Sequence, residues 1–385
     1  MALTTLPTAA FATGSVGTSQ LADGAVTTEK LVADVNFRNI IINGDMSIAQ
    51  RGTSSTSSDF ATVDRNNVLF GTIGATQSQT TDVPSNYTFN NSFKLNVDTA
   101  SSATNANAQI RQIIEAQMIR SSGWNYTSSS SYLTLSFWVK CSLAGTYYAV
   151  FRSEDGTQQS ISKSYTINSA NTWEKKTITI SGNSNITINN DNGRGLTVWF
   201  VFIAGTDNSG SSANLDSWGA FVSGNYTPDS SDAQTFLNTT NANISFTGEQ
   251  LEVGTTASDF EFLPRDINLQ RCQRYYRRFK STGQTEDDFA TIYGNAANGD
   301  HVMVGVPLSP TMRSVPSVSI DNPLTIDDHF RSGRTQSSAN CVINGNGKGT
   351  YIVLKCGNFT SMSTGNTIQF SHNTTTVTIQ FSSEL

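Results

Sequence analysis

The chain has 385 residues, of which 14% are charged and 37% are hydrophobic, and its formal net charge is -6. This charge argues against broad electrostatic binding of nucleic acid, which requires clustered Lys and Arg. No apolar run approaches the length of a membrane span, and the N-terminus lacks the basic and apolar regions of a signal peptide. We therefore expect neither a nucleic-acid partner nor membrane insertion.

Residues 1–36 contain an imperfect ten-residue repeat, in which Val16 and Leu21 recur as Val26 and Leu31. So few apolar residues cannot form a core within one chain. Identical chains wound together, or a larger partner surface, would bury them. We interpret the segment as an extended attachment or oligomerisation segment, with a flexible polar tail as the alternative.

Residues 37–263 form the first predicted domain. Alternating apolar and polar residues predict antiparallel strands with one exposed face. An aromatic content of 10% argues against disorder, while runs of Ser, Thr and Asn are typical of turns and exposed β-faces. The strands fall between an opening segment, Arg38–Gly52, and a closing segment, Phe246–Gly254, which predicts an all-β sandwich of two sheets. Residues 109–119 fit a helix or a strand, and we expect a strand.

Residues 264–288 are predicted to form a linker helix that begins near Pro264, with Asp266 as N-cap. Its basic face, from Arg271 to Lys280, fits a solvated surface, a subunit contact or an anion site. Residues 289–385 have the strand pattern of a second, small β-sandwich.

The four cysteines are too few and too scattered for a disulfide scaffold. Cys341 and Cys356 would face each other if residues 344–349 formed the turn of a hairpin. We nevertheless expect reduced, buried thiols and assembly in a cytoplasm.

Motifs for catalysis and cofactors are missing from the sequence. His301, His329 and His372 lie in no zinc motif, and no glycine-rich phosphate loop is present, so we expect no cofactor. A structural Ca²⁺ bridging loops through Asp carboxylates is conceivable, although no loop has the ligand spacing. Glycosidases need two facing carboxylates, and the acidic residues of this chain are scattered. We therefore expect no enzymatic activity.

Aromatic residues offer a better route to sugar binding, because flat rings stack on the C–H faces of pyranoses. We expect three tryptophans in or beside apolar strands, Trp138, Trp173 and Trp199, to lie in the core. Trp124, Tyr126 and Trp218 are flanked by Ser, Asn and Gly, so they are our candidates for a loop-borne ligand surface. Packing at the rim of the sandwich is the alternative for these three residues.

Several segments together resemble one family. They are the opening segment, residues 133–140 (LTLSFWVK), the closing segment, and residues 271–276 (RCQRYY). They resemble the jelly-roll, carbohydrate-binding-module-like proteins of tailed bacteriophages, often tail fibres or other virion appendages. Residues 21–31 are similar to N-terminal repeats in appendages of phages of marine cyanobacteria. The chain departs from many relatives at Asp64-Arg65-Asn66, where they have an aromatic residue after the Asp-Arg pair.

The resemblance implies a jelly-roll fold and a homotrimer located in the virion. It also implies attachment to other virion proteins through residues 1–36, and binding of host surface polysaccharide by the β-domains. The alternatives are a structural virion component, such as a fibre joint, adaptor or capsid decoration, and, less favoured, a polysaccharide depolymerase.

Overall fold

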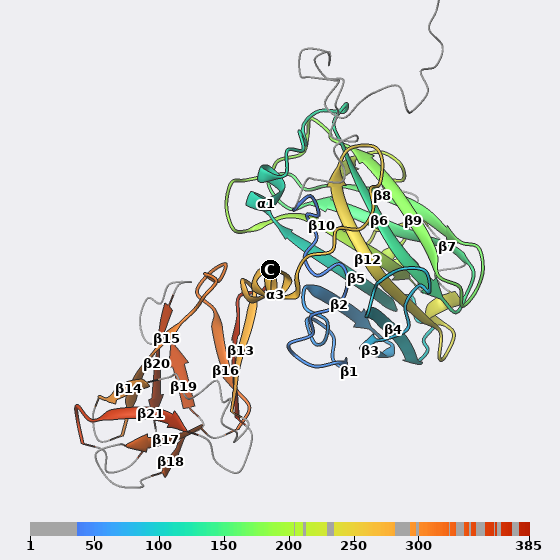
Figure 1. Ribbon diagram of the computed structural model, residues 1–385. Helices are drawn as coiled ribbons and strands as arrows, with labels where there is room; N and C mark the ends of the chain where they lie inside the picture. Colours follow the sequence, from blue (N-terminus) through green and yellow to red (C-terminus); the bar gives the residue numbers. More distant parts are fainter. Residues whose placement is uncertain are drawn as a thin grey trace, which may run out of the picture.

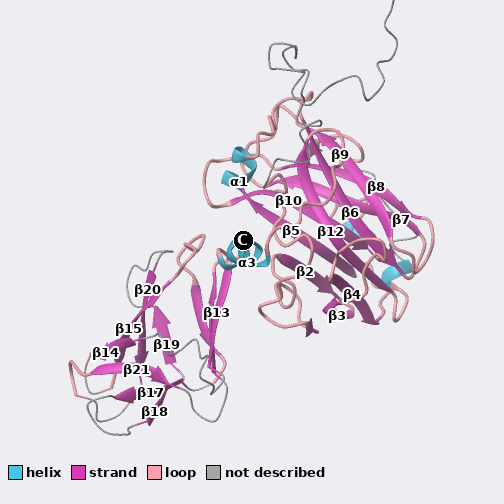
Figure 2. Cartoon of the chain, in the orientation of Figure 1, coloured by secondary structure: helices cyan, strands magenta, loops and turns pink. Residues whose placement is uncertain are grey.

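The structure, a computed structural model, consists of two β-rich domains with a short helix between them (Figures 1 and 2). The predicted attachment residues Val16, Leu21, Val26 and Leu31 lie outside the described part of the chain. The structure describes residues 37–203, 205–210, 213–228, 235–281, 293–297, 300–322, 324–328, 335–338, 340–343, 351–357, 359, 363–371 and 377–385.

The first domain is a sandwich of two six-stranded antiparallel sheets. The first sheet has the order β1 (Ser54–Ser55), β3 (Gly74–Thr80), β4 (Ser92–Thr99), β12 (Asn243–Val253), β6 (Tyr132–Cys141) and β9 (Glu174–Ser181). The second has the order β11 (Gly219–Ala220), β8 (Gln159–Ile167), β7 (Gly145–Ser153), β10 (Arg194–Ile203), β5 (Asn107–Glu115) and β2 (Asn66–Gly71). From β4 to β12 the chain crosses repeatedly between the sheets, so the predicted jelly-roll sandwich is confirmed.

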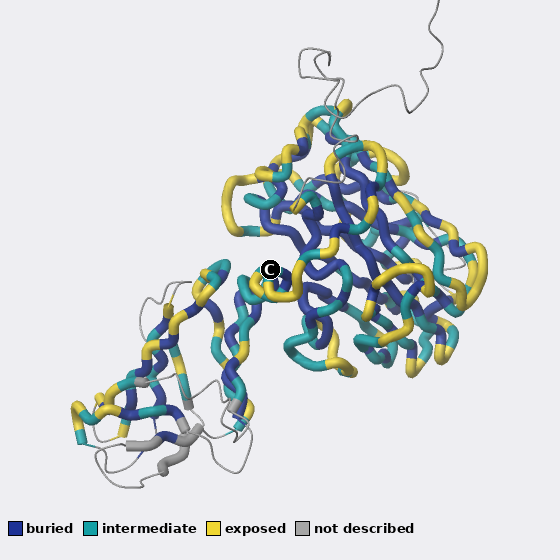
Figure 3. The backbone as a smooth tube through the Cα atoms, in the orientation of Figure 1, coloured by how far each residue is buried: buried dark blue, intermediate teal, exposed yellow. Residues whose placement is uncertain are grey.

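The core lies between the two sheets, where alternate strand residues meet (Figure 3). In β6, Leu133, Leu135, Phe137 and Val139 point inward, and Phe137 reaches Phe200 of β10 with ring centroids 4.9 Å apart. Burying one such side chain contributes about 1.5–3 kcal/mol, so the interleaved rings dominate the stability of the sandwich.

The opening and closing segments, which bound the strands of the first domain in the sequence, lie side by side in the structure. The Ile40 amide donates to the Leu251 carbonyl at 2.9 Å, and the Asn39 side-chain amide donates to the Glu249 carbonyl at 3.0 Å. Gly44 is required here, because a Cβ on it would lie 2.0 Å from the Glu249 carbonyl oxygen. The first residues of the domain therefore form hydrogen bonds with the closing strand β12.

Two predicted elements differ in the structure. Residues 109–119 contain the end of strand β5 and then a short helix, α1 (Ala116–Ser121). The predicted linker helix ends early, because α3 spans only Arg265–Gln273 and is followed by strand β13 (Tyr276–Ser281). Its N-cap is Pro264, while Asp266 lies in the first turn. The second domain thus begins at β13, earlier than residue 289, because Phe279 packs into the core of that domain.

The second domain also consists of two antiparallel sheets around a core, so the second sandwich is confirmed. Its three-stranded sheet has the order β13, β22 (Val377–Ser382) and β16 (Ser317–Ile320). Its seven-stranded sheet has the order β18 (Thr335–Ser338), β17 (Leu324–Asp328), β21 (Thr367–Ser371), β14 (Tyr293–Ala296), β15 (Val302–Pro307), β20 (Tyr351–Gly357) and β19 (Asn340–Ile343).

Cys341 and Cys356 form a disulfide, so the expectation of reduced thiols is wrong for this pair. The antiparallel register of β19 and β20 places the two residues directly opposite each other, which brings their sulfur atoms within bonding distance. Cys141 and Cys272 are buried free thiols, as expected. Within the described ranges, no helix is long and apolar enough to cross a membrane.

Candidate functional site

The aromatic residues predicted as a ligand surface lie near one another at one end of the first domain. The rings of Trp124 and Tyr126 are 6.2 Å apart, and the Trp218 indole N–H donates to the Ser181 carbonyl at 2.7 Å. Trp124 is only 3% exposed and belongs to the core, so the expectation that it presents a ring to solvent is wrong. Tyr126 and Trp218 are half-buried against the same core, and their ligand role stays a prediction.

A different set of rings gathers on the outer face of the first sheet. We call it the aromatic surface, and it consists of Tyr87, Phe89, Trp138, Phe260 and Phe262. The ring centroids of Tyr87 and Trp138 are 4.6 Å apart, and Phe89 lies 5.1 Å from both Phe260 and Phe262. Tyr87 is 45% exposed and Phe262 is 47% exposed. Phe89 is buried beneath them at 4%, whereas Trp138 and Phe260 are half-buried. Clusters of partly exposed rings mark binding surfaces more often than isolated rings do.

Strand alternation explains why the aromatic surface forms. Phe137 and Val139 of β6 point into the core, so Trp138 between them must point outward. The expectation that Trp138 lies in the core is therefore wrong. The apolar residues on both sides of it concealed the alternation of the strand. On the neighbouring strand β12, Gly248 has a φ of +62°, and a Cβ on it would lie 2.6 Å from the Phe89 ring. The glycine therefore lets the rings approach the sheet.

Polar groups border the aromatic surface. Lys140 follows Trp138 by two residues on the same face of β6, and its ammonium lies 2.6 Å from an Asp82 carboxylate oxygen. The Trp173 indole N–H also donates to Asp82, at 3.1 Å. Partial burial raises the pKa of Asp82, but the hydrogen bonds from Lys140 and Trp173 outweigh it and hold the pKa below its ordinary value. The carboxylate is thus charged at neutral pH, beside rings that offer apolar contact.

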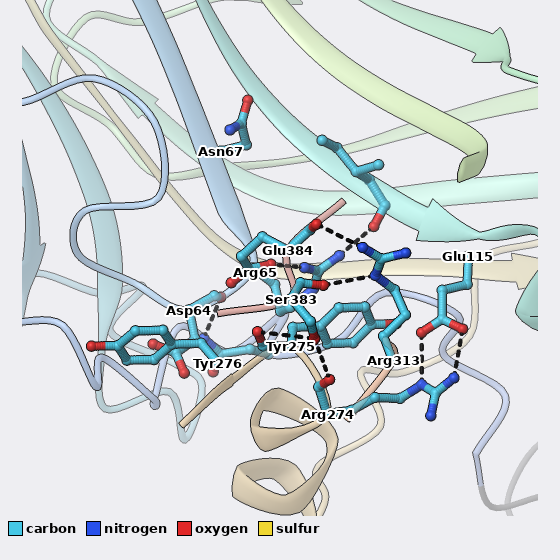
Figure 4. Close-up of polar contacts among 12 residues, drawn as sticks. Asp64, Arg65, Asn67, Glu115, Arg274, Tyr275, Tyr276, Arg313, Ser383 and Glu384 are labelled. Atoms are coloured by element: carbon cyan, nitrogen blue, oxygen red, sulfur yellow. Dashed lines mark hydrogen bonds and ion pairs between the residues drawn. The ribbon is translucent and has the colours of Figure 1, made fainter. Parts of the chain in front are cut away.

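The two domains meet in a joint of ion pairs and stacked rings (Figure 4). Arg274 binds Glu115 through two contacts, of 2.7 and 2.9 Å, and the Glu115 side chain is fully buried. Glu384 of the second domain binds both Arg51 and Arg65 of the first. The Arg65 guanidinium also lies 3.6 Å from the centre of the Tyr275 ring. These contacts hold the domains in a fixed relation.

Beside the joint lies a cavity of about 650 Å³, which we call the arginine cleft. Its first wall is the outer face of β2 and β5, with Asn67, Leu69 and Arg111. The opposite wall is the three-stranded sheet, with Tyr276, Ser319, Gln380 and Ser382. Arg51, Asp59, Arg194 and Glu384 also line it.

The guanidinium of Arg111 is held in place within the arginine cleft. Its guanidinium donates to the Gln109 side-chain oxygen at 2.8 Å and lies 4.7 Å from the centre of the Trp199 ring. Burial, together with the nearby Arg194 and Arg152, lowers the pKa of Arg111 to about 10, although Tyr226 and Glu154 oppose this shift. Trp199 was expected in the core between the sheets. It is buried, but on the outer face of the second sheet, where Phe221 and Tyr226 cover it.

Two basic residues of the predicted linker helix, Arg271 and Arg274, make structural contacts. Arg271 donates to the Asn39 carbonyl at 3.1 Å, and Arg274 belongs to the joint. The part of the chain that the structure describes contains no group of three or more His, Cys, Asp or Glu residues arranged to hold a metal ion.

No protein-family model matches the sequence, and no curated protein matches it either. Partly similar solved structures include the enzymatically active domain of tailspike protein 4 of bacteriophage CBA120, at 14% identity and a TM-score of 0.30. That match covers 57% of this chain and 22% of the tailspike chain.

A family 11 carbohydrate-binding module from Clostridium thermocellum matches at 11% identity and a TM-score of 0.27, over 55% of this chain and 98% of its own. A structure described as a CBM4 module matches at 14% identity and a TM-score of 0.29, over 56% and 99% of the two chains. Likeness at this level assigns no family, and the fold follows from the strand order itself.

Proposed function

We propose that the chain is a non-catalytic glycan-binding protein of a bacteriophage virion appendage, such as a tail fibre. The observation that carries the proposal is the pairing of the exposed Tyr87 with the half-buried Trp138, whose ring centroids are 4.6 Å apart. Trp138 of strand β6 and Tyr87 of the loop between β3 and β4 are tilted by 56° to each other, and their faces provide apolar contact for sugar C–H groups. Lys140 and Asp82 beside them provide hydrogen-bond partners for sugar hydroxyls.

The virion location rests on the resemblance of the sequence to phage appendage proteins. We propose that residues 1–36 attach the protein to other virion proteins, and that the assembled form is a homotrimer facing the host surface. Light scattering tests the oligomeric state, and a stable monomer would exclude the trimer. Release from virions on deletion of residues 1–36 tests the anchor.

We propose no hydrolytic step, because the carboxylates of Asp82 and Glu384 are engaged by cations and Asp59 of the arginine cleft accepts a hydrogen bond from Asn67. Asp82 is bound by Lys140, while Glu384 is bound by Arg51 and Arg65. A glycosidase instead needs one carboxyl group free to donate a proton to the glycosidic oxygen. An assay for reducing ends released from host polysaccharide checks this point.

The test of glycan binding compares the wild type with Tyr87→Ala and Trp138→Ala by affinity electrophoresis. The probes are neutral polysaccharides, namely β-glucan, xylan and galactan, together with extracted host-surface polysaccharide. We expect each substitution to weaken binding at least about tenfold, the equivalent of one lost stacking contact.

Tyr351→Ala is the matched control, because Tyr351 is 55% exposed in the second domain and far along the chain from the aromatic surface. It should leave glycan binding unchanged. Equal losses in all three variants, or no binding by the folded wild type, would contradict the proposal.

A structural virion component is the second candidate, and one observation favours it. Val342 and Tyr351 expose apolar side chains on the adjacent strands β19 and β20, at 57% and 55%. Such side chains suit contact with another protein. If this alternative holds, Tyr351→Ala will impair incorporation into virions, while no variant will alter glycan binding.

A further inference from the structure

We propose that the arginine cleft binds an oxyanion of an acidic saccharide, held between the guanidinium groups of Arg111 and Arg194. This site is separate from the aromatic surface. The inference rests on the proposed function only in taking a saccharide as the molecule that bears the acidic group.

The first observation is a pair of neighbouring cations without a counter-ion. No carboxylate of the described residues lies within 4.0 Å of the guanidinium of Arg111 or Arg194. The cross-strand neighbour of Arg194 is Glu115, but Glu115 is bound by Arg274 at 2.7 and 2.9 Å. Two like charges held close together favour a bound anion.

The second observation is that Arg111 is positioned before any ligand arrives. The hydrogen bond to Gln109 and the stacking on Trp199 fix its guanidinium plane. A guanidinium that is already ordered loses less entropy on binding a carboxylate or sulfate, and its planar fork suits oxyanions. Burial is the main cause of the lowered pKa of Arg111 and the neighbouring Arg194 adds to it, but the group is still cationic at neutral pH.

The third observation comes from Arg51, a residue of the first domain that faces Glu384 of the second. One of its terminal nitrogens contacts Glu384 at 3.1 Å, whereas the other, Nη1, is buried without a hydrogen-bond partner. Asp59 is the other side-chain carboxylate of the cleft, and it accepts a hydrogen bond from Asn67. The cations of the cleft therefore outnumber its side-chain carboxylates.

The remaining lining favours a sugar as the carrier. Ser58, Ser319, Ser382 and Gln380 offer hydroxyl and amide groups, which match the hydroxyls of a pyranose. A volume of about 650 Å³ lies within the range of about 300–1,000 Å³ that is usual for small-molecule sites.

The experiment measures affinity for polygalacturonate and for its methyl ester, which carries the same sugar without the charge. We expect binding to the acid but not to the ester, and weaker binding as salt increases, because the cations are partly exposed to solvent. A second arm compares dextran sulfate with dextran. If the protein binds dextran sulfate but not polygalacturonate, and the cleft substitutions described below remove that binding, the oxyanion is sulfate and the site is supported.

Arg111→Gln and Arg194→Gln should each weaken acidic binding about tenfold. Lys163→Gln is the matched control: it also removes one positive charge, but it lies outside the cleft and pairs with the exposed Asp216. Retained binding of neutral glycan shows that each variant is folded. The proposal is overturned if the wild type binds neither polyanion, or if both cleft variants bind as tightly as Lys163→Gln.

This design separates the site from the proposed function. Trp138→Ala should abolish binding of neutral glycan and leave acidic binding intact, whereas Arg111→Gln should do the reverse. Loss of both activities in either variant would show that there is one site and not two.

Discussion

Glu249 is a fully buried carboxyl group in the core of the jelly roll. Its Oε2 accepts a hydrogen bond from the Gln112 side chain at 3.0 Å, but its Oε1 has no partner. The buried hydroxyl of Tyr165 has none either. Burial raises the pKa of Glu249 from 4.5 to about 8, despite the lowering by Gln112. The group is therefore mostly protonated at neutral pH and costs stability as it ionises.

The first prediction concerns the effect of pH on Glu249. Between pH 4.5 and about 8 the folded state holds one proton more than the unfolded state, so the free energy of unfolding falls as pH rises. The slope approaches about 1.4 kcal/mol per pH unit. Glu249→Gln should remove this slope and stabilise the protein at pH 7–8, as measured by urea denaturation from pH 5 to 9.

Glu174→Gln is the contrasting control. Slight burial raises the pKa of Glu174, but hydrogen bonds from Lys176 and the backbone of residues 168 and 169 outweigh it and lower the pKa to about 2. Its stabilisation is present above pH 4.5 and is lost as pH falls toward about 2. The substitution should therefore destabilise the protein at neutral pH. Parallel pH profiles for wild type and Glu249→Gln would contradict the assignment.

Single residues were predictable from sequence where their strand alternated cleanly. Because side chains alternate along a strand, Phe137 and Val139 point into the core. The same alternation turns Trp138 outward, but its apolar neighbours concealed this in the sequence. Trp124 was misjudged in the other direction. Polar neighbours suggested exposure, whereas its ring lies in the core. For Trp124 the local sequence carries no such signal, because contacts with distant segments decide its burial.

Among the elements, the two segments that meet at β12 were identified in the sequence by their glycine-ended strand patterns, but their contact was not predicted. The contact depends on Gly44, which lies against the Glu249 backbone. We predict that Gly44→Ala destabilises the first domain by about 1–3 kcal/mol, because the backbone must move to admit a methyl group. Thermal or urea unfolding, followed by tryptophan fluorescence, measures the loss.

Gly71→Ala provides the comparison within the same domain. A Cβ at Gly71 would meet only the Asn107 side chain, at an ordinary 3.8 Å, and the residue is in strand β2. This substitution should be neutral, or stabilising by up to about 1 kcal/mol, because alanine suits a strand better than glycine. Similar effects of the two substitutions would show that Gly44 is not constrained.

The linker was the least predictable element. The spacing of Leu269, Cys272 and Tyr276 suits a helix, and α3 does follow it as far as Gln273. The chain then becomes β13, because β22 offers a strand partner from Tyr276 to Ser281. That partner lies about a hundred residues away in sequence, so helix periodicity could not reveal it.

At the scale of the molecule, the sequence predicted two sandwiches but not the joint between them. Its ion pairs connect residues far apart in the chain, such as Glu115 with Arg274 and Arg65 with Glu384. Arginines on the predicted helix suggested three roles, and only the structure shows which partners they meet. The arginine cleft depends on this joint, so it was equally hidden from sequence.

We predict that Arg274→Ala uncouples the two domains. It leaves the buried Glu115 without its cation, which costs on the order of 3 kcal/mol. All five tryptophans lie in the first domain, so fluorescence follows that domain while circular dichroism follows both. The two thermal transitions should coincide in the wild type and separate in the variant.

Lys163→Ala removes an ion pair of a different kind, because its partner Asp216 is 65% exposed. A loss of at most about 1 kcal/mol is expected, with coincident transitions. If the transitions stay together in Arg274→Ala, the coupling depends on the apolar contacts of the joint, such as those of Tyr275, and not on the ion pair.

The position of strand β22 affects the order in which the two domains fold. It lies between β13 and β16, and Glu384 just beyond it reaches Arg51 and Arg65 of the first domain. A nascent chain emerges from its N-terminal side, so the jelly roll can fold during synthesis while the ribosome still holds the rest. The arginine cleft, by contrast, is complete only once residue 384 has left the ribosome. Premature termination would therefore yield a folded jelly roll without its second site.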